Sequence, residues 1–321
     1  MTQTEALKRY ILDDCGMDTV GVASPEALED ERPGHRPEDI LPGVKSIIVF
    51  LKRIPDGIFQ AAFRAKEDGN ADAFSIYAAF ARELTPNMKL FFTGFNIAQH
   101  IERSTGCTSV PIPAGEMQNV TPVNTPLPAF VGAKHVASVL HPGRAAVAAG
   151  LGEIAWNNAF VTERFGPRQG IGLVLTTLEL DCDAPYAGPR LCDPERCGVC
   201  AEVCPVRAIP APGGETECYE VADRTYRTAR INANACAVAS MAFRKEFAGK
   251  ADVPDQILNN DPDDETLKRA YAEKPAAYWS LGHHPDYYCD LCRLYCPLGD
   301  WETHFGGPGF SRFDGKEVRQ P

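Results

Sequence analysis

Apolar residues form three strand-like segments in the amino-terminal part of the chain. Residues 19–23 and 44–51 predict the first two strands, and residues 171–180 predict a third one. Between the first two, Ser24 offers a capping hydroxyl and Pro25 fits the first turn of a helix. A strand, a helix and a strand in this order indicate a layered α/β domain.

Helical spacing of apolar residues occurs in two further regions. Residues 6–11 predict a short amphipathic helix, and residues 71–104 predict two helices that break at Thr85-Pro86. On the second of these, a stripe formed by Phe91, Phe95, Ala98 and Ile101 is expected to face the core. The proline-rich segment 108–130 predicts an irregular lid or pocket wall, and residues 226–250 predict a largely helical stretch.

Composition restricts the class of protein. A length of 321 residues favours two domains, and a net charge of −11 argues against general binding to nucleic acid or anionic membranes. The sequence has no apolar run that could span a bilayer, and its first residues do not resemble a signal peptide. We therefore expect a cytoplasmic protein whose twelve cysteines are reduced.

The cysteines carry the strongest chemical signal. Two segments, residues 192–205 and 289–297, each end in C-x2-C-x3-C-P. That ending is typical of ferredoxins, in which the cysteine before proline reaches a neighbouring [4Fe–4S] cluster. Two such endings in one chain therefore predict two clusters whose ligands cross over.

The crossover assigns the thiols to two sets. The first predicted cluster takes Cys192, Cys197, Cys200 and Cys296. The second takes Cys204, Cys289 and Cys292, and its fourth ligand is Cys236, with Cys218 as the rival. The alternative is zinc, which paired C-x2-C elements also bind, although zinc does not need the doubled C-x3-C-P ending.

Several segments together resemble one superfamily. Residues 19–23 and 36–49 resemble the opening of epoxyqueuosine reductases and reductive dehalogenases. Residues 149–157, followed by Phe165-Gly-Pro-Arg and the strand up to Leu180, resemble the core motif of the same superfamily. Both cysteine segments and Cys236 fall where these families place their clusters. The chain thus resembles a short member that lacks the tRNA-binding carboxy-terminal repeats of epoxyqueuosine reductases.

The resemblance implies an α+β protein with two domains and a tail. Residues 1–181 would form a nitroreductase-like α/β domain that binds a cobamide, and residues 182–305 a ferredoxin-like domain with two [4Fe–4S] clusters. Residues 306–321 would form the tail. An external ferredoxin, flavodoxin or reductase would supply electrons, and the cobamide, bound base-off, would reduce a small-molecule substrate. A homodimer fits the resemblance, whereas a nucleic-acid or membrane partner is not expected.

The remaining site residues follow from position. The predicted cofactor contacts are Gly150, Leu151, Gly152, Trp156 and Asn157, because the two glycines let backbone approach a ligand. The candidate proton donors and their neighbours are Tyr77, His135, His141 and Arg144. For each of them, packing or hydrogen bonding within the fold is the alternative role.

Two other functions stay open. The acidic residue expected before the Gly-Leu-Gly motif has no match, since Lys134-His135-Val136-Ala137 stands there. The chain could therefore be a two-cluster electron-transfer protein that has no corrinoid and docks a partner enzyme. It could also hold another cofactor, such as a flavin or a different metal centre, in the same pocket.

Overall fold

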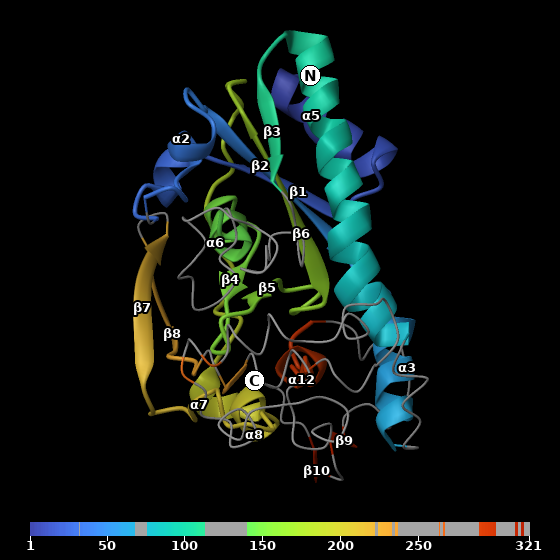
Figure 1. Ribbon diagram of the computed structural model, residues 1–321, viewed down its shortest axis with the longest axis vertical. Coiled ribbons are helices and arrows are strands. Elements are labelled where there is room, and N and C mark those ends of the chain that lie inside the picture. The colour runs from blue at the N-terminus through green and yellow to red at the C-terminus, as the bar shows by residue number, and fades with distance from the viewer. Residues whose placement is uncertain are drawn as a thin grey trace.

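A computed structural model gives the arrangement of the chain (Figure 1). The structure describes residues 1–31, 33–67, 76–112, 140–221, 224–232, 235–236, 263, 266, 289–299, 312–313 and 316–317. His135 and most of the predicted pocket wall and helical stretch, residues 113–130 and 237–250, lie outside these residues.

An antiparallel sheet of four strands forms the centre of the amino-terminal part. Its strands are β1 (Thr19–Ala23), β2 (Ser46–Arg53), β3 (Ser109–Ile112) and β6 (Gln169–Thr176), in the order β1-β2-β6-β3. The three predicted strands are confirmed, with shifts of a few residues at their ends. Because every strand pair is antiparallel, the domain is a mixed α/β fold without parallel crossovers.

Both faces of the sheet are covered, which explains the continuous apolar run of β2. Ile47, Val49 and Leu51 point to the face covered by α6 (Pro142–Ala148). Ile48 and Phe50 point to the other face, which packs on α1 (Gln3–Arg9), the π-helical η1 (Tyr10–Asp14) and α5 (Phe91–Thr105). Successive strand side chains alternate between faces, so a strand covered twice needs apolar residues throughout.

The helical stretch that ends with α5 corrects two predictions. The predicted break at Thr85-Pro86 is wrong, because π-helical η3 (Ala78–Leu90) runs through it into α5. The wider π turn and a hydrogen bond from the Thr85 hydroxyl to the Phe80 carbonyl (2.6 Å) accommodate the proline. Phe95 is also not in the core, being 48% exposed, because Ile97, Ala98 and Ile101 face the sheet instead. Helix α3 (Asp56–Glu67) was not predicted.

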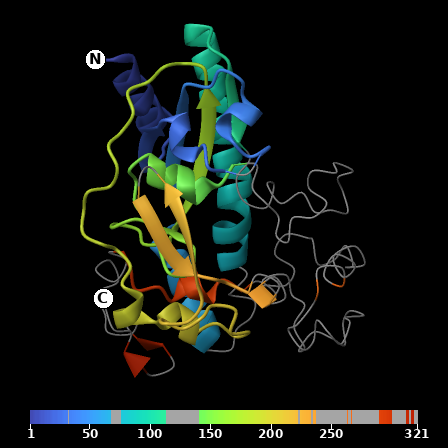
Figure 2. The same ribbon diagram turned by 90° about the vertical axis from the view of Figure 1, so that its left-hand side faces the viewer.

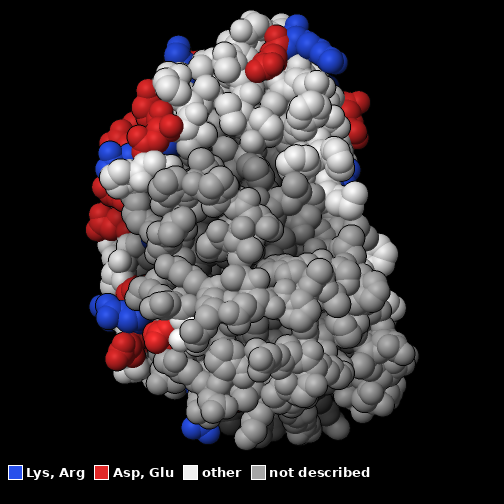
Figure 3. Space-filling model, in the orientation of Figure 1, with Lys and Arg blue, Asp and Glu red and all other residues white. Residues whose placement is uncertain are grey.

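Four short elements complete this part of the molecule. The segment after β1 forms a single 3-10 turn, η2 (Pro25–Leu28), and α2 (Pro37–Ile40) follows it. Strands β4 (Glu153–Ile154) and β5 (Phe160–Val161) form a small hairpin after α6. In the view of Figure 3, acidic side chains gather along the edge of the molecule that carries α2, in keeping with the net charge.

The cysteine segments lie at the end of the molecule opposite β3 (Figure 1). The first contains α7 (Pro194–Cys197) and α8 (Val199–Glu202), and the second contains α12 (Leu291–Leu294). Apolar residues of α8 and α12 pack against α3 and Tyr77, so the amino-terminal half supports this region from one side. No helix in the described parts of the chain is long and apolar enough to cross a membrane.

Two hairpins follow in the carboxy-terminal part, and the first corrects a prediction. Residues 226–229 are not helical but belong to β8 (Arg224–Ala229), which pairs with β7 (Thr216–Val221). Tyr219 and Tyr226 face each other across this pair and stack, with ring centroids 5.8 Å apart, which stabilises the hairpin. In the predicted tail, β9 (Arg312–Phe313) pairs with β10 (Lys316–Glu317).

Candidate metal centre

Four cysteines from two distant segments line one cavity. We call Cys192, Cys197, Cys200 and Cys296 the first thiol group, and all four line the same cavity with Trp156 and Asn157. Pro194 opens α7, and Gly198, at φ 66°, ends α7 and begins α8. This left-handed turn, which glycine adopts without strain, places Cys197 and Cys200 on the same cavity. The structure thus brings together the four thiols that the motif assigned to one set.

Burial keeps these thiols protonated when no metal is bound. Desolvation raises the pKa of Cys200 to about 12, and the neighbouring Cys192 and Cys296 add to the shift. Desolvation also raises the pKa of Cys296 to about 11, against the opposing effect of the Arg168 charge. Metal ions bind the thiolate, so a metal would have to displace these protons.

Backbone N–H groups point at the sulfurs of the first thiol group. The Trp156 N–H donates to Cys192 Sγ (3.4 Å). Desolvation raises the pKa of Cys197 as well as that of Cys296, and backbone N–H donors from Val199 and Leu298, respectively, partly offset these rises. Such donors stabilise negative charge on sulfur, and in iron–sulfur proteins they help to set the reduction potential.

The other four predicted ligands gather nearby. We call Cys204, Cys236, Cys289 and Cys292 the second thiol group. The pKa of Cys292 is raised well above its usual value, first by desolvation and then by the charges of Asp290, Cys289 and Cys236. Cys204 packs with Cys292 against Trp156 and Ile209. The rival, Cys218, is exposed on β7 and pairs across the hairpin with Arg227.

The thiols of these two groups form neither disulfides nor a tight single-ion site. All twelve cysteines lie within the described residues, and none is in a disulfide. Within that same part of the chain, no three His, Cys, Asp or Glu side chains are arranged to hold one metal ion.

The turn after β4 contacts both thiol groups. Besides its N–H bond to Cys192, Trp156 donates from Nε1 to the Pro210 carbonyl (2.8 Å), which fixes the indole. Asn157 Nδ2 donates to the Cys292 carbonyl (3.3 Å). Trp156 and Asn157 therefore line the thiol cavity and connect the two thiol groups, and their predicted contact with a cofactor stays a prediction.

The two glycines predicted to contact a cofactor, Gly150 and Gly152, pack against the protein's own backbone. A side chain at Gly150 would lie 2.0 Å from the Ala184 carbonyl oxygen, and one at Gly152 would lie 2.1 Å from that of Val161. Leu151 packs against the main core. The space beside the two glycines is therefore filled by the protein's own backbone, and the close approach that they permit is to Ala184 and Val161.

A buried arginine that sequence reasoning missed joins the two halves. Arg168 is 1% exposed and donates to the carbonyls of Leu298 (2.7 Å) and Cys296. Burial lowers its pKa to about 10, and the Cys296 charge acts in the opposite direction. It belongs to the Phe165-Gly-Pro-Arg segment, so the motif was the available signal. Arg168 thus holds the loop of Cys296 and brings a positive charge beside this thiol.

Gly166 and Gly299 allow this junction to close. Both have positive φ, 54° and 103°. A side chain at Gly166 would lie 2.0 Å from the Leu298 carbonyl oxygen, and one at Gly299 would lie 2.7 Å from the Gly166 nitrogen. Only glycine fits such a crossing of two backbones without strain.

The candidate proton donors are separated in the structure. Tyr77 is buried beside the second cysteine segment, where its hydroxyl donates to Asp290 Oδ2 (2.5 Å), next to Cys289. Asp290 also pairs with Arg293 (3.3 Å). Tyr77 therefore contacts the surroundings of the second thiol group, and its role in proton transfer stays a prediction.

His141 and Arg144 lie at the start of α6, outside the thiol cavity, and His141 is exposed to solvent. His141 caps this helix, because its Nδ1 accepts the Arg144 backbone N–H (3.2 Å). Desolvation, followed by the Arg144 charge, lowers the pKa of His141. The Arg144 guanidinium pairs with Glu31 (2.9 Å) and lies 4.4 Å from the centre of the Tyr219 ring. Both residues thus have defined packing roles in the fold.

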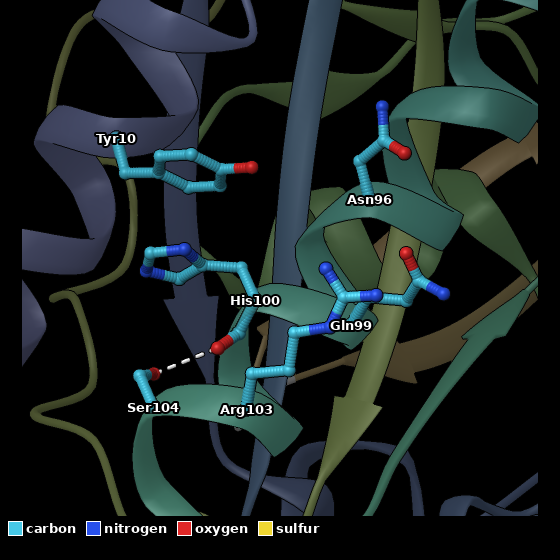
Figure 4. Close-up of a pocket in the computed structure, with 6 residues that line it drawn as sticks. All are labelled: Tyr10, Asn96, Gln99, His100, Arg103 and Ser104. Carbon is cyan, nitrogen blue, oxygen red and sulfur yellow. Dashed lines mark hydrogen bonds between the residues drawn. The ribbon is translucent and has the colours of Figure 1, made fainter.

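A separate hollow of about 340 Å³ lies between η1 and α5 (Figure 4). The rings of Tyr10 and His100 stack at 3.9 Å, and Ser104 donates to the His100 carbonyl (2.7 Å). None of the predicted site residues lines this hollow, so it is distinct from the thiol groups.

Known proteins share parts of this sequence. No family model matches the chain. It is 44% identical over 66 residues to a tetrachloroethene reductive dehalogenase of Desulfitobacterium hafniense, which covers 20% of this chain and 12% of that protein. It is 39% identical over 159 residues to an epoxyqueuosine reductase of Atelocyanobacterium thalassa, which covers 49% of this chain and 35% of that protein.

A solved epoxyqueuosine reductase in complex with a tRNA stem loop aligns with 92% of this chain and 64% of its own, at a TM-score of 0.49 and 16% identity. The matched segments span only 12% and 35% of the length of the two curated relatives. The predicted resemblance is confirmed: this chain is similar to reductive dehalogenases and to epoxyqueuosine reductases.

Proposed function

We propose that this chain is a reductase that holds two [4Fe–4S] clusters, one on each thiol group. The observation that carries the proposal is the first thiol group, in which four cysteines from segments about ninety residues apart line one cavity. The doubled C-x3-C-P ending favours a cubane over zinc, because a zinc site does not need it. The resemblance to two kinds of reductase supports the reaction class.

The chain's own groups fit iron–sulfur clusters, which supply one-electron storage when bound. Four thiols would ligate each cluster, and the N–H groups of Trp156 and Leu298 would stabilise the added negative charge. Arg168, buried beside Cys296, places a positive charge at the same cluster. The Trp156-Asn157 turn contacts both thiol groups and would fix their relative position.

The finer part of the proposal is a cytoplasmic, cobamide-dependent reduction of a small molecule. It rests on the sequence resemblance, because protein backbone occupies the space at Gly150 and Gly152. We therefore assign no reaction step to a corrinoid. The absence of a nucleic-acid partner likewise stays a prediction, since a solved epoxyqueuosine reductase binds a tRNA stem loop.

Reconstitution tests both parts. Protein reconstituted with iron, sulfide and cobalamin is expected to hold about eight iron atoms per chain, as two cubanes require, and to show corrin absorption after desalting. Stoichiometric zinc in place of iron would refute the cluster assignment. Full iron without corrin uptake would leave the clusters intact and remove the corrinoid.

The packing of the two glycines favours a second candidate, an electron-transfer protein with two clusters and no corrinoid. The isolated protein would then show no turnover with a reductant and a halogenated aromatic or epoxide substrate. It would still exchange electrons with a second redox protein.

A further inference from the structure

A groove of about 580 Å³ runs beside the first thiol group. Three segments form it: the run between β6 and α7, the hairpin β4–β5 with its turn, and strand β8. In Figure 2 the β7–β8 hairpin faces the viewer, with the β6–α7 run on one side of it. Its chemically distinctive lining residues are Glu153, Trp156, Arg190, Cys192, Arg224 and Arg227.

The charge of this groove differs from that of the whole chain. Three arginines line it in a protein whose net charge is −11. The carboxylate of Glu153 accepts the Leu191 backbone N–H (2.8 Å), so it is already engaged. Arg224 donates to the Tyr186 carbonyl (2.5 Å), which fixes its guanidinium. The groove therefore offers an excess of positive charge to an acidic partner.

Cys192 connects the groove with the thiol cavity. It lines both hollows, and Trp156, whose N–H donates to Cys192 Sγ, lines both as well. A redox partner seated in the groove would thus contact a ligand of the first cluster directly. Transient redox pairs need less than about 1,200 Å² of buried surface, so a local basic groove is sufficient.

We propose that this groove is the docking surface for a small acidic iron–sulfur carrier protein that reduces the first cluster. The inference rests on the proposed cluster at Cys192. One electron leaves the carrier, whose own centre is oxidised, and enters the cluster held by the first thiol group, which is reduced by one electron. No atom or proton is transferred. A small anion or a nucleic acid could also bind the arginines, but neither would exchange an electron with a cluster at Cys192.

The test compares two double charge reversals in the iron-loaded protein. Arg190→Glu with Arg227→Glu reverses two positive charges of the groove. Arg224, which is hydrogen-bonded to the Tyr186 carbonyl, stays in place. Arg9→Glu with Arg103→Glu makes the same change in charge at two exposed arginines of α1 and α5, outside the groove. Cluster reduction is followed by loss of visible absorbance, with either a reduced plant-type ferredoxin or reduced methyl viologen as the donor.

The groove variant is expected to slow ferredoxin-driven reduction about tenfold or more, with loss of its salt dependence. Its viologen-driven rate should stay within about twofold of the wild type, because a small reductant does not need the docking surface. The variant of α1 and α5 should match the wild type with both donors. If the groove variant loads iron poorly, the milder Arg190→Gln with Arg227→Gln serves in its place and should show a smaller slowing.

Equal ferredoxin-driven rates in the two double variants, at full iron content, would overturn the docking proposal alone. Strong inhibition of the ferredoxin reaction by millimolar inorganic phosphate, but not by sodium chloride of equal ionic strength, would reassign the groove to a small anion. Loss of RNA binding by the groove variant, with electron transfer unchanged, would reassign it to nucleic acid. A preparation that takes up no iron would overturn both the docking and the proposed function.

Discussion

The sheet domain and the cysteine region of this protein are stabilised in different ways. Strand β2 is buried at six consecutive positions between helices on both faces. In the cysteine region (residues 191–210 and 289–299), α7, α8 and α12 have only four residues each. Helices of that length do not form alone in water. The sheet domain thus has an apolar core of its own, whereas the cysteine region depends on its junction with α3 and Arg168 and on any metal it binds.

Removal of iron should produce the largest effect and should separate the two regions. A chelator under reducing conditions is expected to abolish hydrogen-exchange protection in residues 192–204 and 289–299, because their short helices lose the ligand that joins them. Strands β2 and β6 should keep their protection, since their bonds lie in a packed core. Exchange is measured by mass spectrometry. Unchanged protection at 192–204 after complete iron removal would show that metal does not hold this region.

Replacement of single ligands should have the next largest effect. Cys296→Ser is expected to reduce the iron content from about eight to about four atoms per chain, because one cubane loses a ligand. Cys182→Ser, at an exposed cysteine outside both thiol groups, is the matched control and should retain all iron. Iron and acid-labile sulfide are measured after desalting.

The same measurement decides between the rival ligands of the second thiol group. Cys236→Ser should also lose about half of the iron, whereas Cys218→Ser should lose none. A loss of iron from Cys218→Ser with full iron in Cys236→Ser would reverse the assignment.

The strands and the thiol groups could be predicted from the sequence for different physical reasons. Strands β1, β2 and β6 are apolar on two faces, so burial alone makes them visible in the sequence. The thiol groups were visible because cysteine spacing in this motif encodes which sulfurs can converge. In both cases the side-chain chemistry itself carries the signal.

The features that sequence reasoning missed depend on backbone partners or on tertiary context. Arg168 donates hydrogen bonds to the backbone carbonyls of residues 296 and 298. Every residue has a backbone carbonyl, so the sequence does not show which ones an arginine will bind. The helix through Pro86 needs a π turn, which propensity does not anticipate. Strand β8 was read as a helix because the pairing of Tyr226 with Tyr219 is set by a partner strand.

Gly166→Ala tests the junction between the two regions. Alanine at position 166 would have to adopt the left-handed backbone conformation of Gly166, at φ 54°. Its Cβ would also lie 2.0 Å from the Leu298 carbonyl oxygen. We expect a loss of at least about 2 kcal/mol in the free energy of unfolding. Gly57→Ala, near the start of α3 with nothing within 4 Å, is the control and should be neutral or slightly stabilising. Chemical denaturation measures both, and equal stabilities would mean that the junction can relax.

Tyr77→Phe separates a structural role from a catalytic one. The variant removes the hydrogen bond to Asp290, which is 6% exposed but keeps its pair with Arg293. We expect a loss of about 1 kcal/mol in stability, near the lower end for an unsatisfied buried acceptor. If Tyr77 also donates a proton to substrate, turnover should fall by about 100-fold or more. Unchanged turnover with lowered stability would remove Tyr77 from the catalytic candidates.

The smallest expected effect concerns His141, and it belongs to the sheet domain alone. The folded state lowers the pKa of His141 below its ordinary value of 6.5, so the unfolded chain binds the proton more tightly. The stabilisation is therefore complete above about pH 6.5 and is lost as the pH falls through the lower folded-state pKa. A protonated ring also cannot accept the Arg144 N–H.

His141→Asn keeps a capping oxygen but has no group that titrates in this range. Its free energy of unfolding should match the wild type at pH 7.5 and exceed it only slightly at pH 5, because His141 is exposed and the surrounding water weakens the shift. Denaturation curves at the two pH values measure the difference. Parallel curves for the two proteins would show that the cap does not titrate. A fall in turnover of the Asn variant at pH 7.5, at unchanged stability, would restore His141 as a candidate proton donor.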